Sequence, residues 1–278
     1  MKCIFNGQLK DQSEVSLPIH DIAVVRGYGI FDFFRLSQGV PLFIDDHLDR
    51  FYGGAERARL IPPINKHAFK EQILEMIEEN DMPISGIRII LTGGVGNGPY
   101  AVGTPNLIVT QEPISFPTEE MFEKGVKLIT HEYLRDIPEV KTINYMTGIW
   151  LQQMIQEKEA FDVLYVHKGI VHELTRSNIF IVNENRELIT PNGQILKGIT
   201  RKQLIRTLGN VQERDITVEE LASAKEAFIT GTTKKVLPIR AIDDWEYRST
   251  ESGSVTREIM KVFAGIEREY VERNKVKG

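Results

Sequence analysis

Residues 139–150, EVKTINYMTGIW, place a lysine, Lys141, directly ahead of a run of large apolar residues. The apolar residues with helical spacing in and just after this stretch are Ile143, Met146, Ile149, Trp150 and Met154. The sequence therefore predicts a helix with Lys141 at its entrance. An amine that is partly removed from water is a candidate for Schiff-base chemistry, whereas the simpler interpretation is a lysine that extends its ammonium group into solvent.

Length and composition restrict the class of protein. The 278 residues are 41% hydrophobic and 26% charged, with a net charge of −5, which argues against binding to nucleic acid or to an anionic membrane. No stretch has the length of a transmembrane span, and the N-terminus lacks the apolar core of a signal peptide. The single cysteine, Cys3, excludes a disulfide within the chain. We therefore expect a cytoplasmic protein without nucleic-acid or membrane partners.

The order of predicted elements indicates the fold class. Strands and helices are mixed without strict alternation, so we expect an α/β (α+β mixed) protein of two domains. The segment PISFPTEE, residues 113–120, carries two prolines and no periodicity, which is typical of a domain boundary. We expect a smaller N-terminal α/β domain at residues 1–113, a linker at 114–119, and a larger C-terminal domain at 120–278 that contains Lys141.

Local patterns predict particular elements within these domains. Apolar stripes predict amphipathic helices, one with Leu48, Phe51 and Ala55, and a second at residues 67–81. Alternating patterns predict β-hairpins at residues 162–174 and 178–191, and a strand, turn and strand at 227–239. TVEE at 217–220 has the spacing of a capping box ahead of a helix.

Several types of chemistry are disfavoured. GGVGNG at 93–98 lacks the G-x-G-x-x-G spacing because Pro99 follows it, so a flexible loop between strands is the better interpretation. The six histidines are scattered, with no pair three or four residues apart, so we expect no metal site. No G-x-S-x-G motif supports a serine nucleophile.

Residues elsewhere in the chain supply what a phosphorylated aldehyde would need. In ILKGITR, Ile199 and Thr200 begin a predicted helix, whose free N–H groups and dipole attract a phosphate. The turn TGTT at 230–233 adds hydroxyl groups, and Arg50 in the first predicted helix offers a guanidinium group. Each of these signals is weak by itself, and their order along the chain carries more weight.

That order resembles the pyridoxal-phosphate enzymes of fold type IV, the class IV aminotransferases. The matching motifs are VKTINY, VHELTRSNIFIV, LITP, ILKGITR and TGTTKKVLPI, preceded by RGYGIFDFFRL and DDHLDRFYGGAERARL. The resemblance covers essentially all 278 residues. It implies the two-domain fold of that group and pyridoxal 5′-phosphate as the cofactor.

The resemblance also implies roles for individual residues. Lys141 would bind the aldehyde of the cofactor and then move the proton between carbon atoms, and Glu173 would face the pyridine nitrogen. A hairpin charge in water, the alternative for Glu173, leaves the SNIF motif that follows unexplained. The further cofactor-binding residues implied are Arg50, Tyr145, Ile199, Thr200 and Thr232. Core packing is the alternative for Tyr145, and Ser177 and Asn178 either contact the cofactor or shape their turn.

The substrate site is implied by a narrower resemblance, to atypical D-amino acid transaminases that carry RGYGIFD, GIR and EVKTINY. It implies that Arg26 and Arg88 bind substrate carboxylates, with Phe31 and Thr233 beside them. The alternative for each arginine is an ion pair with a nearby acid. Arg26 would come from a neighbouring subunit, so the resemblance implies a homodimer.

The predicted function is therefore transfer of an amino group between an amino acid and a 2-oxo acid such as 2-oxoglutarate. D-amino acids are favoured as donors, and branched-chain L-amino acids come next. The alternative enzyme is 4-amino-4-deoxychorismate lyase, which shares the implied fold, lysine and cofactor-binding residues. A non-enzymatic vitamin-binding protein is disfavoured, because binding alone requires neither Lys141 nor Glu173.

Overall fold

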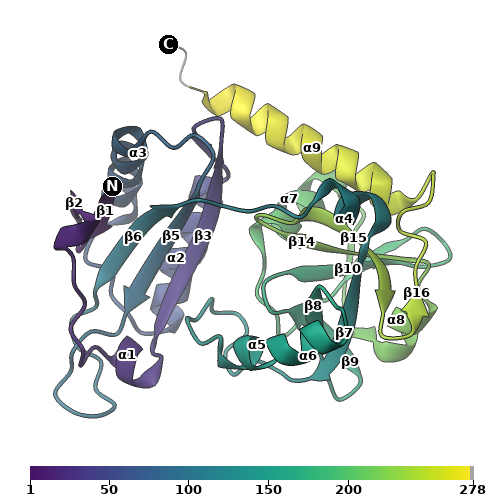
Figure 1. The fold of residues 1–278 in the computed structure, drawn as a ribbon, viewed down its shortest axis with the longest axis horizontal. Helices are drawn as coiled ribbons and strands as arrows, with labels where there is room; N and C mark the ends of the chain where they lie inside the picture. The colour runs from purple at the N-terminus through teal and green to yellow at the C-terminus, as the bar shows by residue number, and fades with distance from the viewer. Residues whose placement is uncertain (276–278) are drawn as a thin grey trace. The chain divides into compact units, whose positions relative to one another are not determined.

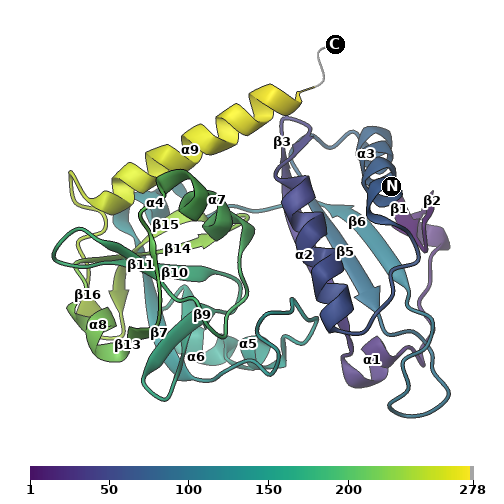
Figure 2. The same ribbon diagram turned by 180° about the vertical axis from the view of Figure 1, so that it is seen from behind.

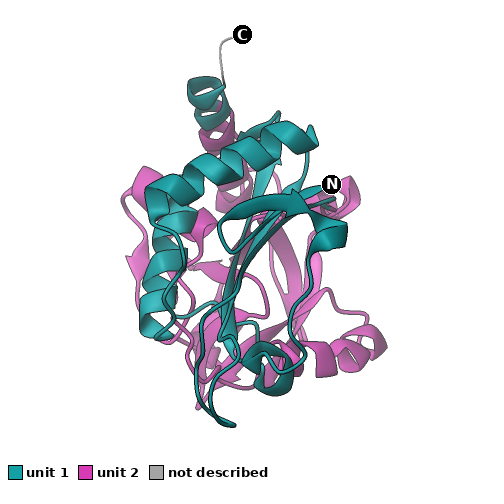
Figure 3. Ribbon diagram, turned by 90° about the vertical axis from the view of Figure 1, so that its left-hand side faces the viewer, with its two compact units in different colours: residues 1–114, 140–144, 269–278 teal, residues 115–139, 145–268 magenta. Residues whose placement is uncertain are grey.

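The computed structural model describes residues 1–275, which form two compact units (Figure 3). Unit 1 contains residues 1–114 and 140–144, together with the chain from residue 269. Unit 2 contains residues 115–139 and 145–268. The strands and helices are labelled in Figure 1. No helix within residues 1–275 has both the length and the apolar character needed to span a membrane.

Unit 1 is built on a six-stranded sheet in which every pairing is antiparallel. Its strands lie in the order β2 (Gln8–Asp11), β1 (Lys2–Phe5), β6 (Leu107–Glu112), β5 (Gly86–Thr92), β3 (Gly29–Ser37) and β4 (Val40–Pro41). Side chains alternate between the two faces of such a strand. In β5, Ile87, Ile89 and Leu91 are fully buried, whereas Arg88 and Ile90 on the opposite face are only partly covered.

Two helices cover the buried face of this sheet, as Figure 2 shows for α2 (Ile44–Arg57). The predicted stripe of α2 is confirmed, since Leu48, Phe51 and Ala55 all lie in the core of unit 1. The second helix, α3 (Lys66–Asn80), buries Phe69, Ile73, Met76 and Ile77 in the same core. Two shorter elements complete this part of the chain: η1 (Gln12–Glu14) and α1 (Ile22–Arg26).

The segment around Lys141 differs from its prediction. It is extended and runs beside the start of β3, where the backbone N–H of Phe31 donates to the carbonyl of Lys141 (2.8 Å) and that of Ile143 to the carbonyl of Gly29 (3.1 Å). Val140 is buried in the core of unit 1. These contacts group residues 140–144 with unit 1, whereas the sequence placed them beyond the linker.

Unit 2 is built on a ten-stranded sheet that closes on itself. Its strands are β7 (Val126–Glu132), β8 (Asp162–His167), β9 (Ile170–Leu174), β10 (Asn178–Val182), β11 (Leu188–Thr190), β12 (Gln212–Glu213), β13 (Ile216–Thr217), β14 (Glu226–Gly231), β15 (Lys235–Ile242) and β16 (Trp245–Glu246). The order β10-β14-β15-β7-β8-β9 forms a ring, because β10 also pairs with β9 through Asn178 and Glu173. The predicted hairpins β8–β9, β10–β11 and β14–β15 are all present.

The helices of unit 2 are α4 (Glu119–Lys124), α5 (Met146–Trp150), α6 (Gln152–Glu157), α7 (Ile199–Leu208), α8 (Val218–Ser223) and most of α9 (Val255–Asn274). A helical segment follows Lys141 as predicted, but it begins only at Met146 and is interrupted at Leu151. Its buried side also differs from the predicted stripe. Leu151 and Ile155 pack on the strands, while Met146, Ile149 and Trp150 are about 70–80% exposed.

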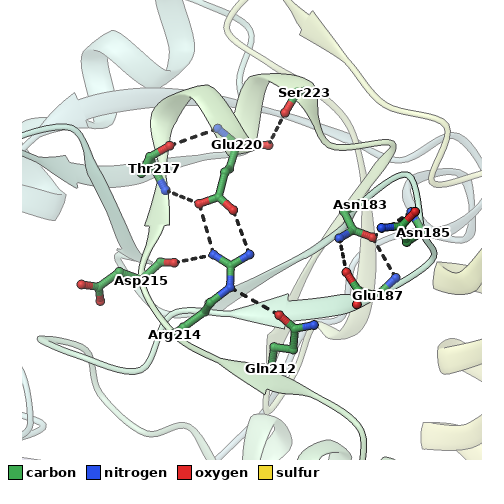
Figure 4. A network of polar contacts seen from close by, with 9 residues as sticks. All are labelled: Asn183, Asn185, Glu187, Gln212, Arg214, Asp215, Thr217, Glu220 and Ser223. Carbon is green, nitrogen blue, oxygen red and sulfur yellow. Dashed lines mark hydrogen bonds and ion pairs between the residues drawn. The ribbon is translucent and has the colours of Figure 1, made fainter.

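A polar network fixes the start of α8 (Figure 4). The Thr217 hydroxyl accepts from the backbone N–H of Glu220, and the Glu220 carboxylate accepts from that of Thr217, which is the predicted capping box. The same carboxylate pairs with Arg214 (2.8 Å). Both halves of the cap are therefore satisfied by local residues.

Candidate active site

Lys141 lies at the edge of the unit 1 sheet, beside the first residues of β3. Its Nζ atom stands 4.5 Å from the centre of the Phe31 ring, a distance suited to a cation–π contact. The side chain is partly buried. The amine therefore rests against an apolar ring, in a position fixed by backbone hydrogen bonds rather than by a helix.

Arg50 is held on α2 by a buried carboxylate of β3. Its Nε and Nη2 atoms donate to the two oxygens of Asp32 (2.8 and 2.7 Å), and Asp32 is about 1% exposed. The imidazole of His47 also contacts Asp32 through Nδ1 (2.7 Å). Asp32 was not identified from the sequence as a site residue. The sequence feature that could have identified Asp32 is its position as the one acid among the apolar residues of IFDFF.

The charges within this group follow from its burial and from the contacts between its members. Burial would raise the pKa of Asp32, but the neighbouring Arg50 charge and the hydrogen bonds lower it well below its usual value. Burial lowers the pKa of His47 more than Asp32 raises it. A neutral His47 that contacts a carboxylate through Nδ1 must carry its hydrogen on that atom. The guanidinium of Arg50 is thus charged and rigidly oriented, with Nη1 directed to neither Asp32 oxygen.

The resemblance implied that Arg88 binds a substrate carboxylate. In the structure, part of its guanidinium already binds an acid of this chain. Its Nε and Nη2 atoms donate to the carboxylate of Glu112 on β6 (3.1 and 2.5 Å). The alternative considered for this residue, an ion pair, is therefore present in the structure. Arg88 also lies near the rings of Phe31 and Phe33, at 5.9 and 5.2 Å from their centres.

Arg26 ends helix α1 and is exposed. Its guanidinium lies 5.9 Å from the centre of the Tyr100 ring, in the loop between β5 and β6. This loop contains GGVGNG and lies between two strands, as expected. A side-chain carbon at Gly94 would lie 1.9 Å from the carbonyl oxygen of Thr104, so the backbone leaves no room for one.

In unit 2, Glu173 occupies the point where the sheet closes. Strand β9 pairs with β10 through Glu173, which lies opposite Asn178. The side chain of Glu173 is 7% exposed. Its carboxylate accepts from Nε of Arg135 (2.8 Å) and from the backbone N–H of Leu196 (3.0 Å). Arg135 was missed in the sequence, because it lies in a loop with no recognisable motif, 38 residues from its partner.

The start of α7 lies close to the end of β10. The amide of Asn178 holds the preceding loop, since it accepts from the backbone N–H of Gly198 (3.2 Å) and donates to the carbonyl of Leu196 (2.8 Å). Gly198 is the N-cap and provides no side chain to the helix end. The first-turn N–H groups, which include those of Ile199 and Thr200, therefore lack a side-chain cap.

Two buried hydroxyl groups near this helix end have no hydrogen-bond partner within residues 1–275: Ser177 Oγ and Thr230 Oγ1. Thr230 pairs directly with Asn178 across β14 and β10, so both side chains leave the sheet on the same face. A buried hydroxyl without a partner is costly. The two hydroxyls and the uncapped helix start together form a donor set suited to an anion.

The remaining predicted residues occupy turns. Thr232 and Thr233 form the tight turn between β14 and β15, one residue beyond the strand that carries Thr230. Tyr145 is the N-cap residue of α5 and is partly buried.

The candidate residues thus form two groups, each within one unit. Unit 1 carries Arg26, Phe31, Arg50, Arg88 and Lys141. Unit 2 carries Tyr145, Glu173, Ile199, Thr200, Thr232 and Thr233. The first group supplies an amine and guanidinium cations. The second supplies a buried carboxylate and neutral anion-binding donors.

Comparison with known proteins identifies one family. The family described as Amino-transferase class IV matches residues 29–242. D-alanine aminotransferase from Bacillus licheniformis is 29% identical over 268 residues, which cover 93% of this chain and 94% of that protein. A Methanocaldococcus jannaschii protein, provisionally named a branched-chain-amino-acid aminotransferase, is 30% identical over 283 residues, with 96% of each chain covered.

Solved structures agree with these sequence relatives. The T.th. branched-chain amino acid aminotransferase, solved with pyridoxamine 5′-phosphate, superposes with a TM-score of 0.86 at 25% identity. The match covers 98% of this chain and 96% of that one.

Proposed function

Because the chain belongs to the class IV aminotransferase family, we propose that it binds pyridoxal 5′-phosphate and transfers an amino group between an amino acid and a 2-oxo acid. When bound, this cofactor supplies an aldehyde that receives amino groups and a ring that accepts electrons. The residues of this chain would position those two features and move the proton.

The observation that carries the proposal is the buried carboxylate of Glu173. A buried carboxylate stays ionised only when it is paired, and Arg135 and the Leu196 N–H provide that pairing. An ionised carboxylate can hold a proton on a pyridine nitrogen, which the electron-accepting ring requires. Glu173 would therefore keep the ring nitrogen charged throughout the reaction.

The donor set of unit 2 fits the phosphate. The start of α7 offers N–H groups and the positive end of a helix dipole, and the orphaned hydroxyls of Ser177 and Thr230 add two donors. Thr232 would add a third hydroxyl. Arg50 would contribute Nη1, because Asp32 occupies its other donor edge. These residues would bind the phosphate and fix the orientation of the ring.

Lys141 would act as the amine that bonds to the cofactor and as the base that moves the substrate proton. Its Nζ atom lies against the Phe31 ring, which removes water from one side of the amine. Tyr145 would reach the oxygen on the cofactor ring.

The substrates proposed are D-amino acids and 2-oxo acids, bound through carboxylates at Arg26 and Arg88, with Phe31 and Thr233 beside them. Arg88 supports this role because it flanks the same Phe31 ring as Lys141. Branched-chain L-amino acids remain the second candidate, since the relatives named for D-alanine and for branched-chain amino acids are almost equally similar, at 29% and 30% identity.

We propose that the protein acts as a homodimer in the cytoplasm. The exposed apolar side chains of Met146, Ile149 and Trp150 lie together on α5, and such a group is more typical of an interface than of a monomer surface. The one cysteine, buried and free, suits a reducing compartment.

The test is the absorbance of the purified yellow protein mixed separately with D-alanine, D-glutamate, L-leucine and L-glutamate. We expect the band of the bound cofactor to shift to that of its amine form with the D-amino acids. The Lys141→Ala variant should retain the fold and lose at least about 10³-fold in turnover. A response to L-leucine alone would indicate the branched-chain reaction. Pyruvate released from aminodeoxychorismate, without any response to amino acids, would indicate the lyase, and a protein that takes up no cofactor would refute the proposal.

A further inference from the structure

The Arg88–Glu112 pair lies on the face of the unit 1 sheet that α2 and α3 do not cover. Arg88 pairs across the sheet with Phe33 on β3 and with Thr110 on β6, and Glu112 is two residues further along β6. Glu112 is therefore the diagonal neighbour of Arg88 on the same face. The two side chains are 37% and 34% exposed, so solutes can reach both.

The geometry of the pair leaves part of Arg88 available. Glu112 occupies the edge formed by Nε and Nη2. Nη1 makes no hydrogen bond within the described part of the chain, so it can donate to a second carboxylate. A ligand at Nη1 would then share the guanidinium with Glu112.

The position of Arg88 relative to the reactive amine limits the distance that such a ligand has to span. The Phe31 ring has Lys141 Nζ at 4.5 Å and Arg88 Cζ at 5.9 Å from its centre. The amine and the guanidinium are therefore separated by no more than about the sum of these distances, which a small amino acid can bridge. In the register of the sheet, Phe31 pairs with Ile90 and Glu112 with Gly86, so Glu112 and Phe31 lie on opposite sides of Arg88 along the strands.

We propose that Glu112 is a specificity-determining residue that favours substrates with one carboxylate over substrates with two. This inference rests on the proposed function, because it takes Arg88 as the group that binds a substrate carboxylate. Glu112 cancels much of the Arg88 charge and occupies its bidentate edge. A second substrate carboxylate would meet the negative charge of Glu112 instead of a free guanidinium edge.

The test compares the Glu112→Gln variant with the wild type, using D-alanine against D-glutamate as donors and pyruvate against 2-oxoglutarate as acceptors. Glutamine has the shape of glutamate without its charge. Repulsion between two like charges several ångströms apart in a partly exposed site corresponds to roughly a 5- to 10-fold change in binding. We expect kcat/KM for the dicarboxylates to rise by about that factor relative to the monocarboxylates, through KM and with little change in kcat.

Two further variants separate this effect from a structural one. Glu75→Gln removes the same charge from the exposed surface of α3, on the other face of the sheet, and should leave the ratio unchanged. In an Arg88→Gln background, Glu112→Gln should no longer raise the ratio, because the two residues act through one guanidinium. Glu112→Ala should shift the ratio in the same direction as Glu112→Gln.

The outcomes are distinct. A rise in the dicarboxylate preference that requires Arg88 supports the proposal. An unchanged ratio overturns it, and so does a higher KM for all substrates, which would mean that Glu112 only holds Arg88 in place. A wild-type protein that transaminates neither D-alanine nor D-glutamate would instead refute the proposed D-amino acid function.

Discussion

Two buried pairs of arginine and carboxylate, one in each unit, have opposite proposed roles. In unit 1 the pair is Asp32 with Arg50, and in unit 2 it is Glu173 with Arg135. The proposed ligand-binding member is the arginine in the first pair and the carboxylate in the second. The other member of each pair also contacts the main chain: Asp32 accepts from the backbone N–H of Phe33, and Arg135 donates to the carbonyl of Pro138.

This difference indicates how a functional charge is supported. The two carboxylate oxygens of Asp32 contact Arg50, His47 and a backbone N–H group. Asp32 therefore holds the guanidinium of Arg50 in place. Arg135 is anchored by a main-chain carbonyl, so it serves as a counter-ion for Glu173. Each supporting residue is thus bound to the main chain as well as to its charged partner.

The largest effect is expected from breaking the pair in unit 1. Asp32→Asn would leave the Arg50 charge, only 15% exposed, without its counter-ion. Removing one partner of a buried ion pair costs about 3–5 kcal/mol. We expect the free energy of unfolding, measured by urea denaturation at neutral pH, to fall by about that amount.

Asp49→Asn is the matched control for this variant. Asp49 lies on the same helix as Arg50 and pairs with Lys66, but both side chains are about half exposed. Exposed pairs contribute at most about 1 kcal/mol. Equal losses in the two variants would show that burial of Asp32 does not matter.

The second prediction compares the activities of two variants of the unit 2 pair, Glu173→Gln and Arg135→Gln. Glu173→Gln would remove the charge that holds the ring proton, and we expect kcat to fall by about 10²–10³-fold, as for other positioned electrostatic groups. Arg135→Gln would leave Glu173 with its Leu196 bond, so we expect a smaller loss, about 10-fold, which is at the low end for contacts to a charged group.

Single-turnover kinetics with D-alanine would measure both losses. If Arg135→Gln were as harmful as Glu173→Gln, Arg135 would be more than a counter-ion. If neither variant changed kcat, the assignment of Glu173 to the ring nitrogen would be wrong.

The same two pairs show what the sequence could and could not predict. The fold class, the family, the hairpins and the amphipathic helices were predicted from motifs and periodicity and are confirmed. Arg50 and Glu173 were identified because they stand in motifs, and their roles stay predictions. Asp32 and Arg135 received no role, because their contacts join residues 18 and 38 positions apart and follow no spacing rule.

The lysine segment was harder to predict for a different reason. The stripe of Met146, Ile149 and Trp150 satisfies helical periodicity, yet these side chains are exposed and Leu151 and Ile155 are buried instead. Periodicity identifies an apolar face without telling whether the same chain or another one covers it. The extended path of Lys141 depends on backbone bonds to β3, which no local pattern encodes.

A third prediction concerns how stability depends on pH through His47, which contacts Asp32 of the unit 1 pair. Burial lowers the pKa of His47 below the ordinary value of 6.5, so the unfolded chain binds a proton that the folded chain does not. The stability of the wild type should therefore fall as the pH drops through about 6.5, by up to about 1.4 kcal/mol per pH unit. Thermal melts between pH 8 and pH 5 should show a shallower fall for His47→Gln than for the wild type. A fall of equal slope in both proteins would exclude His47 as its cause.

The smallest effect is expected at the exposed pair of Arg214 and Glu220, which provides the surface counterpart of both buried pairs. Its side chains are 42% and 39% exposed, and Glu220 also bonds to the backbone of Thr217 (Figure 4). Arg214→Gln should cost less than about 1 kcal/mol, because water replaces the lost contact and the capping box remains. Thr217→Ala should cost about 1 kcal/mol, because it removes the cap itself. Urea denaturation would rank the two, with transaminase activity unchanged in both. A loss in Arg214→Gln as large as that of Asp32→Asn would mean that burial does not distinguish the pairs, and the comparison between surface and interior would fail.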